Sequence, residues 1–384
     1  MKLQNKIAID KVSLPLLRPF FDQEEIDEIK KVFDSGWVAQ GPKVKEFERC
    51  CAKYLGCNYA IAVTNCTAAL HLALLALGIK KGDDVLVADY TFPATGHSVL
   101  YCGARPVFVD INRETYNLDP VELKKKLTKR SKVIMPVHTF GQPADMDPIM
   151  EFAEAYDLKV VEDAACALGA KYKGNQAGTI GHIGCYSFHA RKGVTTGEGG
   201  MVVTNDESLA ESIRYLSVFG MKTAWERKKS KKFSIPIFTD LGYNYKMSDI
   251  AAAIGVVQLK RLDKILRRKR QLAKYWDTQL QDVKYIKPPY IDEHVRPVYQ
   301  AYVTLIDKGI DRNGVIDDLA MLGIQTNIGT YASHIQPVYK SKDRCPNSLE
   351  VFKRALSLPL YYGMMELNID LATSKLRQTL ERRR

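Results

Sequence analysis

Short runs of β-branched and other apolar residues alternate with amphipathic stretches of helical period over residues 59–219. This alternation narrows the fold more than any other feature, because it is typical of a largely parallel sheet covered by helices on both faces. Seven runs predict strands: Tyr59–Val63, Asp84–Asp89, Pro106–Ile111, Lys132–His138, Lys159–Asp163, Gly184–Phe188 and Gly200–Asn205.

Amphipathic stretches lie between most of these runs and predict helices: Thr67–Leu77, Ala94–Tyr101, Pro120–Leu127, Asp147–Tyr156 and Glu207–Phe219. The last two strand runs are separated by too little chain for a helical crossover, so one of them is expected to be antiparallel. The sequence therefore predicts an α/β fold with a mostly parallel, seven-stranded sheet.

The pattern changes at Ser248, which is a good N-cap for a long helix over Asp249–Leu280. A shorter mixture of strands and helices follows, with a predicted strand at Pro297–Ile306. A chain of 384 residues also exceeds one ordinary core. We therefore expect a large domain over residues 14–250 and a small C-terminal α/β domain over residues 251–384, with residues 1–13 packing nearby.

The chain carries a formal net charge of +12, with basic clusters at Arg227–Lys232, Arg267–Arg270 and Arg382–Arg384. These clusters could attract an anionic partner such as a nucleotide, a phosphate or RNA. Taken singly, each is more typical of a solvated helix face or a frayed tail. Since neither a helix-turn-helix nor an aromatic-basic RNA motif accompanies the charge, it does not favour nucleic acid.

Cysteines and apolar runs exclude several classes of protein. The eight cysteines include no C-x-x-C pair, which argues against a metal site or a disulfide framework and for reduced, mostly buried thiols. No apolar run approaches the ~20 residues that a membrane span needs, and the first residues lack a signal-peptide pattern. The expected location is the cytoplasm, without membrane attachment.

Polar residues follow the predicted strands at the sheet edge where open α/β sheets bind ligands. The first helical residues after Tyr59–Val63, including the Thr67 hydroxyl, could cradle a phosphate, or could simply cap a helix. Asp163 ends a strand whose run Val160-Val161 is expected to be buried, so its carboxylate needs a cation. A protonated pyridine nitrogen would serve, as would an ordinary salt bridge or helix cap.

The stretch SFHARKGVTTGEGG, residues 187–200, contains Lys192 followed by two threonines and four glycines. Glycines at this density favour close approach of a ligand to the backbone. A single lysine in a chain with 56 lysines and arginines is nevertheless most often a surface charge. Its neighbours, rather than the lysine itself, single out Lys192.

The segment SFHARKGVTTGEGGMVVTND resembles the lysine segment of the DegT/DnrJ/StrS family of sugar aminotransferases that depend on pyridoxal phosphate (PLP). The resemblance extends from about Leu14 to Leu262, with weaker matches in GIQTNIGTYASHIQPVY and SLPL. The other segments that carry it are GWVAQGPKVKEFE, TNCTAALHLALLALG, DYTFPATGHSVLYCGARPVFVDI, VHTFGQPADMDPI, VVEDAACALGA and LGYNYKMSDIAAAIGVVQL. It implies the type I, aspartate aminotransferase-like fold of PLP-dependent transferases.

The resemblance also implies roles for individual residues. Lys192 would form the Schiff base with PLP, Asp163 would pair with the pyridine nitrogen, and Phe92 would stack on the ring. Partial burial and the cationic ring are expected to make the freed Lys192 amine less basic, so that it can shuttle protons. Three further residues would bind the phosphate: Thr67, Ala68 and Ser187.

Asn244 matches an asparagine that reaches the phosphate from the neighbouring subunit, which implies a homodimer with shared active sites. Two positions depart from the family pattern. Cys166 stands where His or Gln is common near the ring, and Cys66 stands where a small residue precedes the phosphate-binding threonine. Both departures could alter cofactor affinity or make the enzyme sensitive to oxidation.

The implied reaction transfers an amino group from an amino acid, glutamate by family analogy, to a keto sugar, most often one carried on a nucleotide, in amino-sugar or surface-polysaccharide biosynthesis. The basic segment Lys222–Lys232 could contact the diphosphate, or could be a solvated loop. Four further residues are candidates for the sugar site: Trp37, His189, Tyr331 and His334.

Two alternatives stay open. The first is a PLP enzyme of the same fold with other chemistry, such as a sugar dehydratase or a transaminase acting on a cyclitol or another ketone. Dehydratases of this family have His in place of the lysine, so Lys192 argues against them. The second is a regulatory or nucleic-acid-binding protein that uses the fold to sense a ligand. Only the positive charge of the chain supports this alternative.

Overall fold

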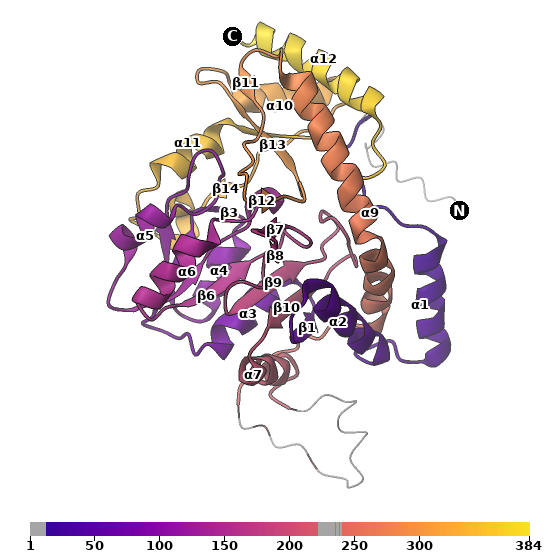
Figure 1. Ribbon diagram of the computed structural model, residues 1–384, viewed down its shortest axis with the longest axis vertical. Coiled ribbons are helices and arrows are strands. Elements are labelled where there is room, and N and C mark those ends of the chain that lie inside the picture. The colour runs from indigo at the N-terminus through magenta and orange to yellow at the C-terminus, as the bar shows by residue number, and fades with distance from the viewer. Residues whose placement is uncertain (1–12, 222–234, 236–237, 239) are drawn as a thin grey trace, which may run out of the picture.

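The computed structural model describes residues 13–221, 235, 238 and 240–384 (Figure 1). Its centre is a seven-stranded sheet in the order β1-β10-β9-β6-β5-β2-β4. β10 is antiparallel to both of its neighbours, and the other adjacent pairs are parallel. The predicted strand count and the predicted antiparallel member are confirmed. The strands are β1 (Tyr59–Val63), β2 (Asp84–Ala88), β4 (Arg105–Val109), β5 (Ser131–Met135), β6 (Lys159–Asp163), β9 (Ile183–Ser187) and β10 (Gly200–Thr204).

Helices cover both faces of this sheet. Helices α3, α4 and α7 bury their apolar sides against one face, and α2, α5, α6 and the first half of α9 pack on the other. Side chains that accept hydrogen bonds from the first turn fix several helix starts, among them Asp22 for α1 and Asn65 for α3. The helices up to residue 217 are α1 (Gln23–Ser35), α2 (Pro42–Leu55), α3 (Cys66–Ala76), α4 (Ala94–Tyr101), α5 (Pro120–Lys126), α6 (Met146–Ala155) and α7 (Glu207–Ser217).

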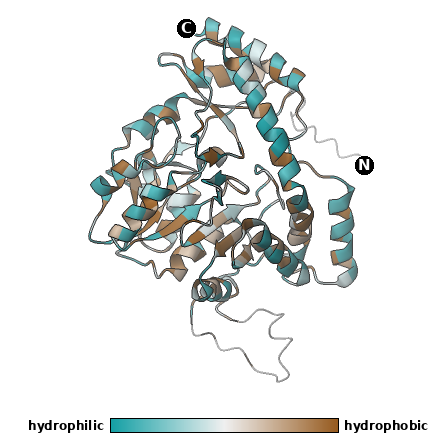
Figure 2. Ribbon diagram, viewed as in Figure 1, coloured by the Kyte–Doolittle hydropathy of each residue, from teal (hydrophilic) through white to brown (hydrophobic). Residues whose placement is uncertain are grey.

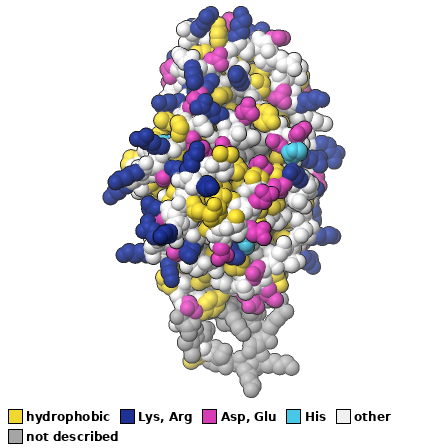
Figure 3. Space-filling model, turned by 60° about the vertical axis from the view of Figure 1, so that its left-hand side comes forward, with side chains coloured by type: hydrophobic (Ala, Val, Ile, Leu, Met, Phe, Trp, Pro, Cys, Tyr) yellow, Lys and Arg dark blue, Asp and Glu magenta, His cyan; other side chains and the backbone are white. Residues whose placement is uncertain are grey.

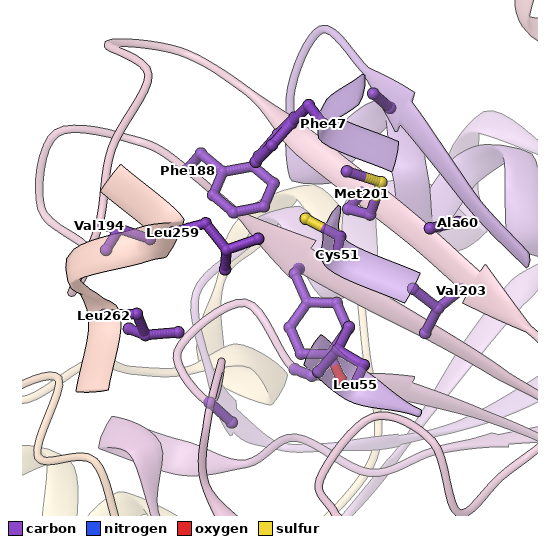
Figure 4. Packing of buried hydrophobic residues seen from close by; sticks show 14 of the residues in the cluster. Phe47, Cys51, Leu55, Ala60, Phe188, Val194, Met201, Val203, Leu259 and Leu262 are labelled. Carbon is purple, nitrogen blue, oxygen red and sulfur yellow. The ribbon is translucent and has the colours of Figure 1, made fainter. Parts of the chain in front are cut away.

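Apolar residues concentrate on the central strands and the helices against them, whereas α1 at the outside is mostly hydrophilic (Figure 2). Figure 4 shows side chains of α2, β10 and α9 converging around Phe188, which lies in the loop after β9. The loop that follows the strand is therefore anchored in the core from its first residue.

The predicted long helix is present as α9 (Asp249–Leu280), and its N-cap Ser248 accepts a hydrogen bond from the Ala251 amide. Its first half packs in the core of the large sheet, and its second half, including Trp276, packs in a separate core with a second sheet. This antiparallel sheet has the order β11-β13-β15. Because one helix serves both cores, the division into domains at residues 250/251 stays a prediction.

The second sheet consists of β11 (Ile286–Lys287), β13 (Tyr302–Ile306) and β15 (Ala355–Leu358), and its helices are α10 (Arg312–Met321), α11 (Pro346–Arg354) and α12 (Glu366–Arg382). Short strands join the two parts, since β14 pairs with β3 and β12 pairs with β7. The remaining elements are β3 (Tyr90–Thr91), β7 (Lys171–Tyr172), β8 (Asn175–Gln176), β12 (Val295–Arg296), β14 (Tyr331–Ala332) and the 3₁₀ turns η1 (Thr139–Gly141), η2 (Ser333–Ile335) and η3 (Pro337–Tyr339).

The predicted strand Pro297–Ile306 is too long, since only Tyr302–Ile306 joins the sheet. The preceding residues hydrogen-bond to a loop instead: the Val298 amide donates to the Gly141 carbonyl, and the Gln300 amide donates to the Phe140 carbonyl. Tyr299 between them has a φ of 48°, which is incompatible with a strand. The segment therefore braces the large sheet rather than extending the small one.

Basic clusters are engaged more than their patterns predict. Lys269, within Arg267–Arg270, is only 4% exposed, so this cluster is not simply a solvated face. Arg382 and Arg383 both pair with Asp318, so the C-terminal cluster is not a frayed tail. Figure 3 shows Lys and Arg side chains spread around one face, with acidic side chains among them. The cluster Arg227–Lys232 lies outside the described residues.

Within the described part of the chain, no helix has the length and apolarity that a membrane span requires. Ser13 and Leu14 hydrogen-bond to the Gly323 carbonyl beside the second sheet. Residues 1–12 lie outside the described residues, so their predicted packing is untested.

The second core should depend strongly on Trp276. Its ring is fully buried and stacks on Tyr302 with centroids 5.8 Å apart, and its Nε1–H donates to the Pro359 carbonyl at 2.9 Å. We expect Trp276→Ala to lower the free energy of unfolding by about 3–5 kcal/mol, because it leaves a large cavity. Urea unfolding followed by circular dichroism measures this loss, with the exposed Lys274→Ala as control. Equal stability of the two variants would contradict it.

Candidate active site

The loop that carries Lys192 joins β9 to β10 and is held by its own backbone. The Phe188 amide donates to the Gly199 carbonyl, and the Lys192 amide donates to the His189 carbonyl, both at 2.9 Å. Phe188 and Val194 are buried in the core beneath the loop. The position of Lys192 is therefore fixed by packing and by hydrogen bonds on both sides of it.

The Lys192 amine lies beside a thiol. Its Nζ donates to Cys166 Sγ at 3.2 Å. Burial lowers the pKa of the Lys192 ammonium, but Cys166, Cys66 and Asp163 together outweigh burial, so the net direction is upward. The expectation of a less basic amine concerned a lysine beside the cationic cofactor ring, so it stays a prediction.

Asp163 ends β6 with its side chain 4% exposed. Its Oδ2 accepts a hydrogen bond from Thr95 Oγ1 at 2.7 Å, and its Oδ1 accepts one from the Ala165 amide at 3.1 Å. Burial raises the pKa of Asp163, and these two hydrogen bonds and the charge of Lys192 offset only part of the rise. A cation placed against this carboxylate would be stabilised strongly, and it would hold the carboxylate ionised.

Phe92 follows β3 and is connected to Asp163 through Thr95. Its backbone carbonyl accepts from the Thr95 amide at 3.2 Å, so the residue that binds Asp163 also ties down Phe92. The Phe92 ring is 65% exposed and meets Tyr331 edge-on, with centroids 6.3 Å apart. A large exposed ring held in this way is suited to stacking on a flat ligand.

The N-terminus of α3 lies directly against β10, at the end of β1. An added Cβ on Gly200 would lie 2.5 Å from the carbonyl oxygen of Asn65, so only glycine permits this approach. Thr67 is in the first turn, where free amides favour an anion. The Ala68 amide, a predicted phosphate donor, instead donates to Asn65 Oδ1 at 2.8 Å. An anion there would have to displace the Asn65 side chain, a capping residue that sequence analysis missed.

Ser187 ends β9 opposite Gly200 and is 9% exposed. Its hydroxyl accepts from the His189 amide at 3.3 Å. His189 itself is partly exposed, with Nε2 3.7 Å from Glu198 Oε1. Both residues therefore lie just before Lys192 in the chain, and their roles as phosphate and sugar contacts stay predictions.

Three other predicted residues have hydrogen-bond partners outside the Lys192 loop. Asn244 is exposed beside α7, and its Oδ1 accepts from Lys246 Nζ. His334 donates its amide to Asp89 and pairs through Nδ1 with the same carboxylate at 2.7 Å. Trp37 follows α1, where its amide donates to Ser35 Oγ. The predicted segment Lys222–Lys232 lies outside the described residues.

Sequence analysis also missed Thr95 and Lys269. Thr95 lies in the quoted motif TFPAT, but only the fold shows that its hydroxyl meets Asp163. Lys269 lines the same two small cavities as Lys192 and could not be distinguished from its basic neighbours in sequence. A larger cavity lies elsewhere, between α2, β1 and α7, and contains none of the predicted site residues.

The site thus combines an amine, a buried carboxylate that favours a cation, an exposed aromatic ring and a helix N-terminus. The sequence profile of the DegT/DnrJ/EryC1/StrS aminotransferase family matches residues 19–377. The chain belongs to this family. The predicted family and enzyme class are therefore confirmed.

Two curated relatives of known name match nearly the whole chain. Spore coat polysaccharide biosynthesis protein SpsC of Bacillus subtilis is 40% identical over 367 residues, covering 93% of this chain and 94% of the relative. GDP-perosamine synthase of Caulobacter vibrioides is 38% identical over 370 residues, covering 94% and 97%. Both similarities span nearly the whole chain, so they include both sheets and the candidate site.

Solved structures confirm the predicted fold. Spr1654 of Streptococcus pneumoniae, assigned as a sugar aminotransferase, matches in its PMP form with a TM-score of 0.90 at 28% identity, over 96% of this chain and 99% of its own. Its PLP form matches with a TM-score of 0.88. The aminotransferase TlmJ of Streptoalloteichus hindustanus matches with a TM-score of 0.89 at 30% identity, over the same shares. The predicted cofactor is thus the one named for a solved relative.

The buried Asp163 should cost stability in the cofactor-free protein, because the charge of Lys192 offsets only part of the cost of its burial. Its folded pKa is raised, so its unfavourable contribution grows as pH rises from its ordinary value of 3.8 toward the folded value, and it is absent below both. We expect cofactor-free Asp163→Asn to be more stable than the wild type at pH 7, by about 1 kcal/mol, and equally stable near pH 3.

Thermal unfolding of the cofactor-free proteins at several pH values measures this difference. Asp282→Asn, at an exposed aspartate, is the control and should leave the difference between the two pH values unchanged. A lower stability of Asp163→Asn at pH 7 would show that its hydrogen bonds outweigh its desolvation.

Proposed function

We propose that this protein transfers an amino group from an amino acid, glutamate, to the keto carbon of a nucleotide-linked keto-deoxy sugar, with PLP as its cofactor. The observation that carries the proposal is the placement of Lys192 and Asp163 after two adjacent parallel strands, β9 and β6, with the Lys192 amine near the carboxylate. Family membership supports the aminotransferase class, and the two curated relatives support a sugar substrate.

The residues of the site fit PLP. Asp163 would face the pyridine nitrogen, since a buried carboxylate with a raised pKa lacks a full cationic partner. The exposed Phe92 ring would cover one face of the cofactor ring, and Thr67 and Ser187 would hold the phosphate at the start of α3. When bound, PLP supplies an electron sink for charge that develops at the carbon losing its proton.

Lys192 would bind the cofactor and act as the acid and base. Its Nζ takes the proton that the Cα of the amino donor loses, and in the second half-reaction it delivers a proton to the carbon that receives the amine. Asp163 remains ionised beside its cation, and the hydrogen bonds from Thr95 and the Ala165 amide fix its orientation. Since two substrates react in turn at one lysine, ping-pong kinetics are expected.

Cys166 occupies the position beside Lys192 Nζ and would lie near the cofactor. The candidate sugar contacts remain His189, Tyr331, Trp37 and His334. We propose in addition that two chains form a homodimer in which Asn244 of one subunit reaches the phosphate bound by the other. The exposure of Asn244 supports this arrangement. A cytoplasmic location remains part of the proposal.

Lys192→Ala should bind no cofactor covalently and show no measurable transamination, because no other described residue brings an amine next to both Cys166 and Asp163. The visible absorbance of the purified protein and its reaction with glutamate test this. Lys264→Ala removes an exposed lysine and should retain both properties. A Lys192→Ala protein that keeps the absorbance and the activity would overturn the assignment.

The substrate class can be tested in the second half-reaction. The purified enzyme is first converted with glutamate to its pyridoxamine form, and then mixed with a panel of keto sugars. We expect nucleotide-linked keto-deoxy sugars to restore the absorbance of the aldehyde form within seconds, and the same sugars without the nucleotide to do so at least ten times more slowly, because they lack the anionic anchor. Equal rates with a cyclitol ketone would contradict the proposed substrate.

A further inference from the structure

A second lysine, Lys269 of α9, lies beside the Lys192 loop. Two small cavities are lined by Lys192 together with Gly193 and Lys269. Lys269 is 4% exposed, whereas lysines are almost never buried without a reason in packing or chemistry. Lys269 belongs to helix α9, which packs in both cores, so the position of its backbone is fixed.

Lys269 is connected to the backbone next to Lys192 through Gln300. Its Nζ donates to the Gln300 carbonyl at 3.2 Å, and the Gln300 side-chain amide donates to the Arg191 carbonyl at 2.9 Å. The backbone amide of Gln300 donates to the Phe140 carbonyl, which fixes the position of this residue. The Lys269 amine is therefore held in place on the side of the loop that faces α9.

We propose that Lys269 is a positioning residue for Lys192: it braces the loop that carries Lys192 and, as a second cation lining the same two small cavities, disfavours positive charge on the Lys192 nitrogen. Two like charges in a site with little water repel strongly. The inference rests on the proposed function, since it assigns Lys269 to the same site.

Charge on each amine affects the other. Burial is the main reason why the pKa of Lys269 falls to about 8; the charge of Lys192 contributes to this fall, and Cys166 opposes it. Such an interaction is mutual, so charged Lys269 must lower the proton affinity of Lys192 equally. Cys66, Cys166 and Asp163 favour positive charge on Lys192, and Cys166 does so on Lys269 as well. Lys269 opposes them from α9. One of the two cavities is also lined by Arg18, Arg191, Tyr361 and Tyr362.

The effect has a defined pH range. Lys269 carries its charge below pH of about 8 and loses it above. Its repulsion of charge on Lys192 is therefore present at neutral and acid pH and fades as pH rises past that value. A group that only filled space would show no such dependence.

The test compares Lys269→Met, which keeps the length and removes the charge, with Lys269→Arg, which keeps a charge at all pH values. The exposed Lys264→Met on the same helix is the control. For each holoenzyme, the visible absorbance of the cofactor bound at Lys192 is titrated from acid to alkaline pH. We expect the midpoint to rise by about one pH unit in Lys269→Met and not to rise in Lys269→Arg or the control.

A second measurement keeps the inference separate from the proposed function. In full-length protein freed of cofactor, an amine-reactive reagent labels Lys192, and the rate is read from its peptide by mass spectrometry. At pH 7, labelling should be about ten times slower in Lys269→Met than in the wild type, and at pH 10 the rates should agree. This result would stand even if the protein transferred no amino group to a sugar.

Unchanged labelling and an unchanged midpoint in a folded Lys269→Met protein would overturn the inference and leave Lys269 a packing residue. Should Lys269→Met not fold, Lys269→Arg decides. Because arginine remains charged at pH 10, labelling of Lys192 at this pH should be faster in Lys269→Arg than in the wild type. An equal or slower rate would contradict the inference.

Discussion

Two adjacent acids at the end of β6 have opposite environments, and the site depends on that contrast. Glu162 and Asp163 are both buried and point to opposite faces of the sheet. Glu162 receives hydrogen bonds from His138 and from the backbone amides of residues 178, 180 and 181. Asp163 receives fewer and has a raised pKa. The hydrogen bonds of Glu162 fix the end of β6. They therefore hold Asp163 in its buried position, although its carboxylate lacks a full cationic partner.

The ring orientation of His138 completes the first of these environments. Its Nδ1 accepts from the Ala144 amide at 3.0 Å, so the proton of the neutral ring is on Nε2, which donates to Glu162. The loops after β5 and β6 and the turn before β9 are thereby linked through one carboxylate. Strand register then sets the distance to the Lys192 loop, since Asp163 pairs with Cys185 two residues before Ser187 ends β9.

Periodicity alone predicted the sheet, the long helix and the polar residues at the strand ends, because these depend on local sequence and on the fixed geometry of parallel strands. It could not predict contacts between distant segments. The Thr95 hydroxyl on Asp163, the Asn65 side chain on the Ala68 amide and the buried amine of Lys269 each depend on tertiary packing. The Pro297–Ile306 strand was too long for the same reason, since loop contacts outweigh the β propensity of its first residues. The roles of the site residues came from the family resemblance, and no pattern of period or charge would have supplied them.

Helix α9 passes without interruption from one core into the other. One residue inserted near its middle would rotate everything beyond it by about 100° and advance it by about 1.5 Å. Trp276 would then leave its core while Val256 stayed in its own. The length of helix α9 therefore fixes the distance and the rotation between the two cores. Related chains can differ in the lengths of their loops. The number of residues between the two cores along α9 must stay the same, because the helix is not interrupted by a loop that could absorb a change.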